Sequence, residues 1–234
     1  MKNLIVANWK MNPTSKKEAE EIFNNIKNGA ENTKAEVVIC PPFVYLSLLG
    51  GMTIGAQNCF YEESGAFTGE ISPVMLKDLG VEYVIIGHSE RRKYFGEIDE
   101  VINKKINKSL GLGLKIIFCI GETAEEHDSG KKNEVLEKQL KLGLEGITDF
   151  SNINIAYEPV WAIGTGNNCS VEETKESLNF IRGFLPENTR VLYGGSVKSE
   201  NSGAYMKEAG ADGLLVGGAS LNAQEFVKII KSAD

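Results

Sequence analysis

Short apolar runs recur along the whole chain, each bounded by Gly, Pro, Asn or Asp. Runs of this length and boundary predict buried β-strands. They are apolar on both alternating faces, which is typical of a parallel sheet covered by helices. The eight runs are Leu4–Trp9, Val37–Cys40, Met52–Gln57, Tyr83–Gly87, Lys115–Ile120, Asn154–Tyr157, Arg190–Tyr193 and Gly213–Val216.

The stretches between these runs carry apolar residues at helical spacing. The clearest is Val171–Leu185, and Ser170 with Glu173 predicts a capping box at its start. Ser72 followed by Pro73 predicts another helix N-terminus. Two further apolar faces repeat at helical spacing, namely Ile98, Val101, Ile102, Ile106 and Leu110, and Leu136, Leu140 and Leu144.

Eight strand–helix units in 234 residues match the size of a closed (β/α)8 barrel. An open doubly wound sheet is the alternative, but it usually carries a G-x-G-x-x-G turn after its first strand. In this chain Asn8–Asn12 occupies that place. Because no linker or charge block divides the sequence, we expect one α/β barrel domain over residues 1–234.

Composition and charge narrow the classes of function. The net charge of −7, with both signs interspersed, argues against nucleic acid as the main partner but allows a small phosphorylated substrate. The longest apolar runs are too short to span a bilayer, and the N-terminus lacks the apolar core of a signal peptide. Four widely spaced cysteines indicate a reduced, cytoplasmic setting, and two histidines without H-x-x-x-H spacing argue against a zinc site.

Residues 156–166 form the most informative segment, Ala-Tyr-Glu-Pro-Val-Trp-Ala-Ile-Gly-Thr-Gly. Glu158 stands at the end of the sixth predicted strand, and Pro159 stops that strand because proline has no N–H for the ladder. Small residues then surround apolar ones, which suggests a cover that swings over a small substrate and excludes water. A base beside such a cover suggests an enzyme that forms a reactive intermediate and protects it from water.

Reactive side chains and two Gly-Gly turns follow the C-terminal ends of the predicted strands, where barrels of this kind build their active sites. They are Asn8, Lys10, His88, Glu90, Glu158, Gly194-Gly195-Ser196 and Gly217-Gly218. Either Gly-Gly pair alone is best explained as a tight turn, but together they favour backbone N–H groups that bind phosphate. In isolation His88 would be a structural histidine. We expect His127 to be a solvated loop residue and Cys119 to be a buried core residue.

These segments together resemble the triosephosphate isomerase family over essentially the whole chain. The matching motifs are Asn8-Trp-Lys10, Ser64-Gly-Ala-Phe-Thr-Gly-Glu-Ile71, Gly87-His-Ser-Glu-Arg-Arg92, Cys119-Ile-Gly-Glu122, Ala156–Gly166, Tyr193-Gly-Gly-Ser-Val197 and Gly213-Leu-Leu-Val-Gly-Gly-Ala-Ser220. The resemblance implies a TIM barrel that interconverts dihydroxyacetone phosphate and D-glyceraldehyde 3-phosphate through an enediolate, with no metal and no organic cofactor.

The same resemblance implies a role for each residue of the site. Glu158 would move a proton between neighbouring carbons, and a neutral His88 would polarise the carbonyl oxygens; this family is itself a standard example of such a histidine. Lys10 and Asn8 would stabilise the developing oxyanion, with Glu90 beside Lys10 and the substrate. The phosphate would be held by backbone N–H groups of Gly164, Ser196, Gly217 and Gly218.

The resemblance also implies a homodimer. The loop Gln57–Ile71 would reach into the partner subunit and place Thr68 near the partner's active site. Such a crossing would explain why Phe60, Tyr61 and Phe67, which look exposed, are aromatic. A wide surface loop without a partner is the alternative.

The chain departs from the family pattern in two places. After Gly166 it reads Asn167-Asn168-Cys169 where the family commonly has a Lys-Thr-Ala-like hinge, so we expect different opening and closing rates with the chemistry retained. The connections near Leu46–Gly51 and Gly183–Thr189 are also short, and they lie away from the predicted active site.

Two other functions stay open at this stage. A Schiff-base aldolase of phosphorylated sugars would need a lysine well inside a strand end, where the sixth predicted strand offers Glu158 instead. A catalytically silent phosphate-binding barrel would be expected to lack Glu158, His88 or Lys10, and all three are present.

Overall fold

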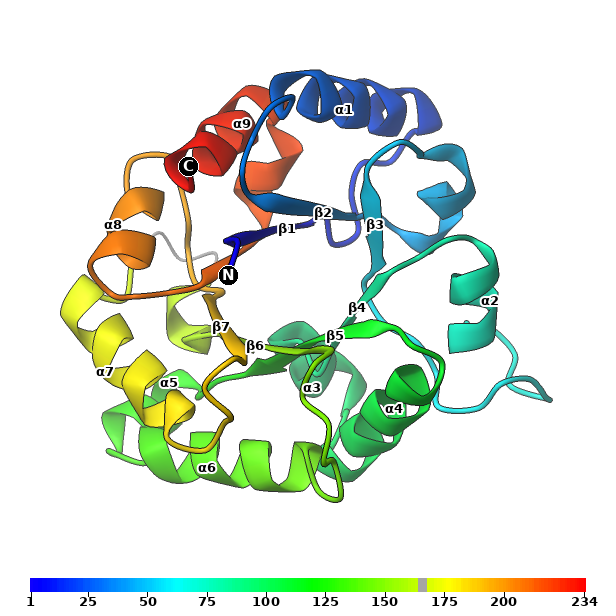
Figure 1. The fold of residues 1–234 in the computed structure, drawn as a ribbon. Coiled ribbons are helices and arrows are strands. Elements are labelled where there is room, and N and C mark those ends of the chain that lie inside the picture. The colour runs from blue at the N-terminus through cyan, green and yellow to red at the C-terminus, as the bar shows by residue number, and fades with distance from the viewer. Residues whose placement is uncertain (164–167) are drawn as a thin grey trace.

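The computed structural model describes residues 1–163 and 168–234 and forms the closed barrel that the sequence predicts (Figure 1). Its eight parallel strands pair in chain order, and the last closes onto the first. They are β1 Leu4–Asn8, β2 Glu36–Cys40, β3 Thr53–Ala56, β4 Tyr83–Ile86, β5 Lys115–Ile120, β6 Ile153–Tyr157, β7 Arg190–Tyr193 and β8 Gly213–Val216. Each predicted strand is confirmed to within one residue at either end, and closure excludes the open doubly wound sheet.

Helices connect the strands and form an outer ring around the barrel (Figure 1). They are α1 Lys16–Gly29, α2 Pro73–Asp78, α3 Ser89–Phe95, α4 Asp99–Gly111, α5 Ala124–Asp128, α6 Lys132–Gly143, α7 Val171–Arg182, α8 Ser202–Lys207 and α9 Ala223–Ser232, with the 3-10 turns η1 Phe43–Leu48, η2 Val160–Ala162 and η3 Gly218–Leu221. The connection from β2 to β3 contains only the 3-10 turn η1, in the region that the sequence marks as short.

Two layers of apolar side chains explain why the strand runs are apolar on both faces. Alternate side chains along each strand point into the barrel or outward beneath the helices. The inner layer includes Val38, Ile85, Ile117 and Leu192. Cys119 belongs to this layer and is fully buried, which confirms it as a core residue.

The predicted helix starts are confirmed in part. The Ser72 hydroxyl accepts the N–H of Met75 at 3.1 Å, and Pro73 is the first residue of α2. The Ser170 hydroxyl likewise accepts the N–H of Glu173 at 3.0 Å. The reciprocal half of that capping box is wrong, because the Glu173 carboxylate turns to the side chains of α5 and α6 instead.

The apolar face predicted for α4 is correct except at its start. Ile102 and Ile106 are fully buried against the barrel. Ile98 occupies the N-cap position, one residue before the helix, and its side chain is 57% exposed. Its place on the buried face is therefore a wrong prediction, because the helical period begins only at Asp99.

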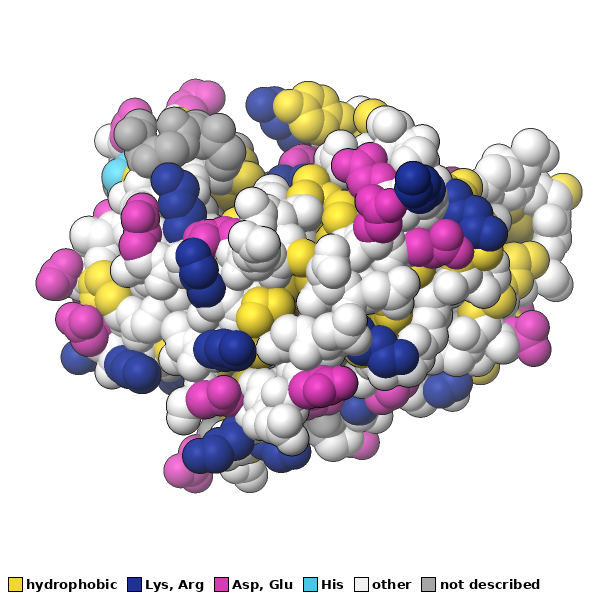
Figure 2. Space-filling view, turned by 90° about the horizontal axis from the view of Figure 1, so that it is seen from above, with side chains coloured by type: hydrophobic (Ala, Val, Ile, Leu, Met, Phe, Trp, Pro, Cys, Tyr) yellow, Lys and Arg dark blue, Asp and Glu magenta, His cyan; other side chains and the backbone are white. Residues whose placement is uncertain are grey.

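Acidic and basic side chains are interspersed over the face shown in Figure 2. Among the helices of residues 1–163 and 168–234, none is both long and apolar enough to cross a bilayer.

Candidate active site

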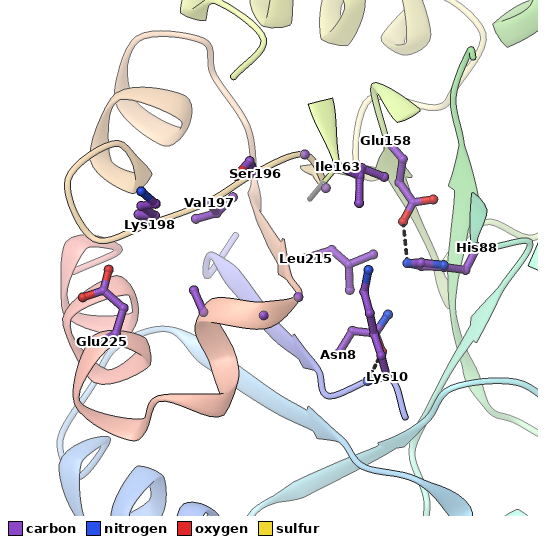
Figure 3. Close-up of a pocket in the computed structure, with 15 residues that line it drawn as sticks. Asn8, Lys10, His88, Glu158, Ile163, Ser196, Val197, Lys198, Leu215 and Glu225 are labelled. Carbon is purple, nitrogen blue, oxygen red and sulfur yellow. Dashed lines mark hydrogen bonds and ion pairs between the residues drawn. The ribbon is translucent and has the colours of Figure 1, made fainter. Parts of the chain in front are cut away.

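One end of the barrel is hollowed by a cavity of about 390 Å³ (Figure 3). Its walls come from the loops that follow β1, β4, β6, β7 and β8, so segments distant in sequence meet there. The predicted site residues that line it are Asn8, Lys10, His88, Glu158, Ser196, Gly217 and Gly218. The structure thus brings these predicted catalytic and phosphate-binding positions to one place, while Glu90 lines a neighbouring cavity together with Asn8, Lys10 and His88. Gly164 lies outside the described residues.

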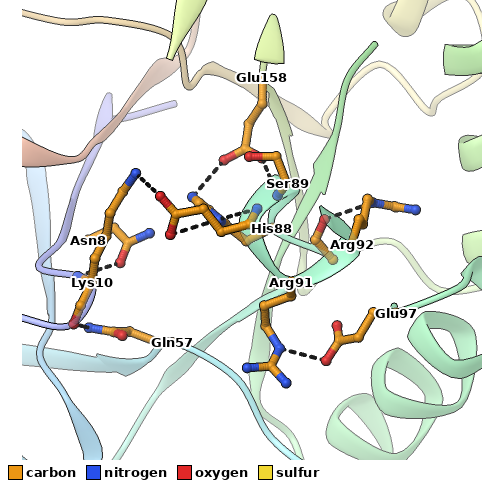
Figure 4. A network of polar contacts seen from close by, with 11 residues as sticks. Asn8, Lys10, Gln57, His88, Ser89, Arg91, Arg92, Glu97 and Glu158 are labelled. Atoms are coloured by element: carbon orange, nitrogen blue, oxygen red, sulfur yellow. Dashed lines mark hydrogen bonds and ion pairs between the residues drawn. The ribbon is translucent and has the colours of Figure 1, made fainter. Parts of the chain in front are cut away.

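Glu158 is a buried carboxylate with two defined partners (Figure 4). Its Oε1 lies 3.1 Å from His88 Nε2, and its Oε2 accepts the backbone N–H of Ser89 at 2.8 Å. The Glu158 backbone passes very close to Gly121. A Cβ at Gly121 would stand 1.7 Å from the Glu158 carbonyl oxygen. Ser89 therefore holds the carboxylate, and Gly121 leaves room for the Glu158 backbone; the sequence shows both only as members of longer motifs.

His88 is held in one tautomer by the start of α3. Its Nδ1 accepts the backbone N–H of Glu90 at 3.2 Å, so that nitrogen carries no proton. The ring proton of a neutral imidazole is then on Nε2, the atom that faces the Glu158 carboxylate. This assignment follows from the hydrogen-bond pattern. His88 can therefore donate a hydrogen bond into the cavity as a neutral group.

Lys10 has an uncommon backbone conformation, with φ of 54°. Its N–H donates to Asn8 Oδ1 at 3.0 Å, and its carbonyl accepts from Gln57 Nε2 at 2.8 Å. The Lys10 ammonium lies 2.5 Å from Glu90 Oε1, so the predicted Lys10–Glu90 proximity is confirmed. Gln57 holds the strained turn, a role that its place at the end of a predicted strand does not reveal.

The other end of the cavity combines backbone of the loops after β7 and β8 with the side chains of Val197, Lys198 and Glu225 (Figure 3). Ser196 follows β7, while Gly217 and Gly218 lie where η3 begins after β8. The first N–H groups of a helical turn have no partner within that turn, and they attract anions. At Gly195 a Cβ would stand 2.3 Å from the Tyr193 hydroxyl, so this position of the loop requires glycine. The backbone N–H groups at this end of the cavity suit a phosphate.

His127 lies in a helix and not in the loop that the sequence predicts, although its side chain stays 32% exposed. A complete capping box between Thr123 and Glu126 builds the short helix α5, which carries His127. The imidazole Nε2 lies 2.9 Å from Glu173 Oε1, and the ring centroid lies 4.7 Å from that of Trp161. The loop prediction is wrong because the capping box starts a helix at this point, and the two contacts could not be foreseen because they come from distant parts of the chain.

Cys169 is buried immediately before α7. Its carbonyl accepts the Tyr205 hydroxyl at 2.7 Å, and Tyr205 stacks on Tyr193 with ring centroids 3.9 Å apart. This packing links Cys169 to Tyr193, the last residue of β7, whereas Asn167 of the predicted hinge lies outside the described residues. An effect of Cys169 on opening and closing rates stays a prediction, which unchanged loop kinetics in Cys169→Ala would remove.

The chain matches the triosephosphate isomerase family model over residues 3–233. It is 49% identical to the triosephosphate isomerase of Aquifex aeolicus, with 99% of this chain and 100% of that relative covered. It is also 49% identical to the enzyme of Alkaliphilus oremlandii, over 98% of each sequence. The corresponding enzyme of Thermodesulfovibrio yellowstonii is 48% identical, over 98% of this chain and 99% of the relative.

Proposed function

Because the chain belongs to the triosephosphate isomerase family, we propose that Glu158 is the base that moves a proton along a triose phosphate bound in the cavity. The family assignment makes the chain an isomerase that interconverts dihydroxyacetone phosphate and D-glyceraldehyde 3-phosphate. It also sets aside the aldolase and the silent barrel. The mechanism is supported above all by the buried Glu158 carboxylate facing His88 Nε2 at 3.1 Å.

The reaction needs one proton to leave a carbon beside the carbonyl and to return to the neighbouring carbon. Glu158 takes the proton, the electron pair of the broken C–H bond forms a C=C bond, and the π pair of the carbonyl moves onto its oxygen to give an enediolate. His88 donates its Nε2 proton toward the oxygens and shuttles it between them. Glu158 then returns its proton to the former carbonyl carbon, so that Glu158 and His88 regain their initial protonation states.

The negative charge of the enediolate requires donors that are already in place. Lys10 and Asn8 line the cavity on the side of β1, across from Glu158 (Figure 3). Fixed donors in a site closed to water stabilise charge strongly because they need no reorganisation during the reaction. Glu90 pairs with the Lys10 ammonium and so orients it.

The phosphate would lie at the glycine end of the cavity. Backbone N–H groups of Ser196, Gly217 and Gly218, together with Gly164, would bind its oxygens. The segment Pro159–Gly166 would close over the substrate and keep the enediolate from losing its phosphate. Its described part supports this, because Ile163 lines the cavity beside the catalytic residues. Loop closure in this family is itself a standard example of such protection.

A homodimer completes the proposal. The segment between β3 and α2 projects from the barrel (Figure 1), and its residues from Glu62 to Glu70, including Thr68, are exposed. Rings within it pack on each other, with centroids 4.7 Å apart for Phe60 and Phe67. Phe67 nevertheless stays 42% exposed, which leaves apolar surface for a partner.

A matching surface lies beside Lys10. A second cavity of about 210 Å³ is lined there by Met11 and Phe95, which are 90% and 69% exposed in the single chain. A partner's loop that covered them would bury this apolar surface next to the active site. Sedimentation should give twice the chain mass of 25.6 kDa, and Phe67→Asp should give single chains.

We place the enzyme in the cytoplasm because its four cysteines are all free and buried, as expected in a reducing compartment.

Isomerase activity of Glu158→Gln tests the proposed base. The amide keeps the size of the side chain but cannot take a proton, so kcat should fall by about 10²- to 10⁴-fold with little change in KM. Glu172→Gln, an exposed position in the first turn of α7, is the matched control and should retain parental activity. A kcat of Glu158→Gln within tenfold of the parent would show that another group is the base.

A further inference from the structure

His127 lies outside the cavity, at a point where three elements meet. It is carried by α5, while Glu173 belongs to the first turn of α7 and Trp161 to η2. In Figure 1 the helices α5, α6 and α7 lie together on one side of the barrel. Trp161 follows the catalytic Glu158 by only three residues, so a group that holds Trp161 acts close to the base.

Both ring nitrogens of His127 face carboxylates. Nε2 lies 2.9 Å from Glu173 Oε1, and Nδ1 lies 3.2 Å from Asp128 Oδ1. A neutral imidazole has only one N–H and leaves its other nitrogen as a lone pair against an anion. The imidazolium donates to both carboxylates. The arrangement therefore favours the protonated ring.

The protonated ring also suits its contact with Trp161. The two ring centroids are 4.7 Å apart, with their planes at 41°. A cation within about 6 Å of an indole face is attracted by the ring quadrupole, which a neutral imidazole is not. Trp161 Nε1 also donates to Glu122 Oε1 at 2.8 Å. The indole is thus contacted by both a carboxylate and the His127 ring.

The charged groups around His127 are mostly acidic. Glu173, Asp128 and Glu122 face it from α7, from α5 itself and from the connection after β5, and all favour a positive ring. Lys132 on α6 is the opposing charge, but its ammonium lies 3.3 Å from Glu173 Oε1 and shares that carboxylate. Hydrogen bonds to Glu173 and Asp128 raise the pKa of His127 above the ordinary value of 6.5.

We propose that protonated His127 is a positioning residue that anchors Trp161, and through it the segment Glu158–Ile163, in the arrangement that places Glu158 and Ile163 against the cavity. The proposal rests on the proposed function for its catalytic consequence. As pH rises and His127 loses its proton, one carboxylate contact and the attraction to the indole are lost. Substrate affinity should then fall, while the proton-transfer step, which uses Glu158 and His88, continues.

Tryptophan fluorescence tests the contact without any activity. The chain has two tryptophans, Trp9 and Trp161, and Trp9 is fully buried. A protonated imidazole next to an indole quenches its emission, so the parent's emission should increase between about pH 6 and 8.5. His127→Gln and Trp161→Phe should each abolish the transition. A transition that persists in His127→Gln, or a flat parent profile, would overturn the proposal.

Steady-state kinetics test the consequence. At pH 6, His127→Gln should raise KM about 3- to 10-fold with kcat within twofold of the parent, and the ratio of the two KM values should approach one by pH 8.5. His127→Arg keeps the charge and should hold KM near the parent's low value throughout. A KM ratio that stays constant with pH would indicate a merely structural role and refute the inference. If the proposed isomerisation failed, the fluorescence transition would still decide whether His127 anchors Trp161.

Discussion

Lys10 shows how much of this site depends on the conformation of one residue. Its φ of 54° lies in the left-handed region, which residues with a side chain rarely adopt. In this conformation the Lys10 side chain lines the cavity, and its ammonium pairs with Glu90. The conformation persists because the backbone on both sides is held, by Asn8 through the N–H and by Gln57 through the carbonyl.

Gln57→Met should therefore lower activity, although we place no substrate contact at this residue. The methionine fills the space but cannot donate to the Lys10 carbonyl, so the strained turn can relax and the ammonium can move. We expect kcat/KM to fall about 10- to 100-fold. The free energy of unfolding should fall by only about 1 to 3 kcal/mol, the usual cost of leaving a buried acceptor unpaired.

Gln224→Met, the same change at an exposed position of α9, is the control and should alter neither quantity. Assays of kcat/KM and urea unfolding on the same preparations separate the two effects. Parental kcat/KM in Gln57→Met would mean that the Lys10 conformation does not depend on this hydrogen bond.

Among the helices, α4 illustrates what periodicity predicts and what it misses. The spacing of Ile102 and Ile106 correctly identifies the buried face, because a helix side that lies on a barrel must be apolar along its length. The same pattern extends one residue too far, to Ile98, because a helix boundary depends on the capping geometry and not on the period. The N-cap of α4 therefore lacks a side-chain hydrogen bond.

Ile98→Ser should stabilise the protein. A serine at the N-cap can accept a free backbone N–H from the first turn, which is worth about 0.5 to 2 kcal/mol. Little apolar burial is lost, because the Ile98 side chain is 57% exposed. The thermal midpoint should rise by about 2 to 4 °C for each kcal/mol in a chain of this size. Ile98→Ala, which removes the same side chain without adding an acceptor, should give no increase.

Elements and their order were predictable because they depend on local patterns. Glu158, His88 and Lys10 could be located because each directly follows a recognisable strand, and strand ends converge in a closed barrel. The residues that support them, such as Gln57, could not be located from the sequence. Gln57 is 47 residues from Lys10, and His127 is 46 from Glu173, so only the folded chain shows that these side chains meet.

Across the whole molecule, the end of the barrel opposite the cavity is closed by an ionic network. Glu36, Tyr83, Lys115 and Arg190 are the first residues of β2, β4, β5 and β7. The Glu36 carboxylate accepts from the Tyr83 hydroxyl at 2.5 Å and from the Arg190 guanidinium at 2.9 Å, with the Lys115 ammonium 3.5 Å away. One carboxylate therefore ties together four strands that are not all neighbours.

Stability should depend on the ionisation of this carboxylate. Burial alone would raise the pKa of Glu36, but the Tyr83 hydrogen bond and the Arg190 charge outweigh it and lower the pKa below 4.5. A carboxyl group with a lowered folded-state pKa stabilises the fold above its unfolded pKa. That contribution is lost as pH falls through the folded-state pKa, when Glu36 is protonated in both states.

Glu36→Gln should therefore destabilise the protein in a pH-dependent way. At pH 7 we expect a loss of about 1 to 2 kcal/mol in urea unfolding, because the amide still fills the space but carries no charge for Arg190 and Lys115. The difference from the parent should shrink as pH falls below about 4.5. Glu21→Gln, at an exposed position of α1 whose only ion pair is 3.8 Å long among the described residues, should show no comparable difference at any pH. A loss in Glu36→Gln that stayed constant down to acid pH would place the contribution of Glu36 in packing and not in its charge.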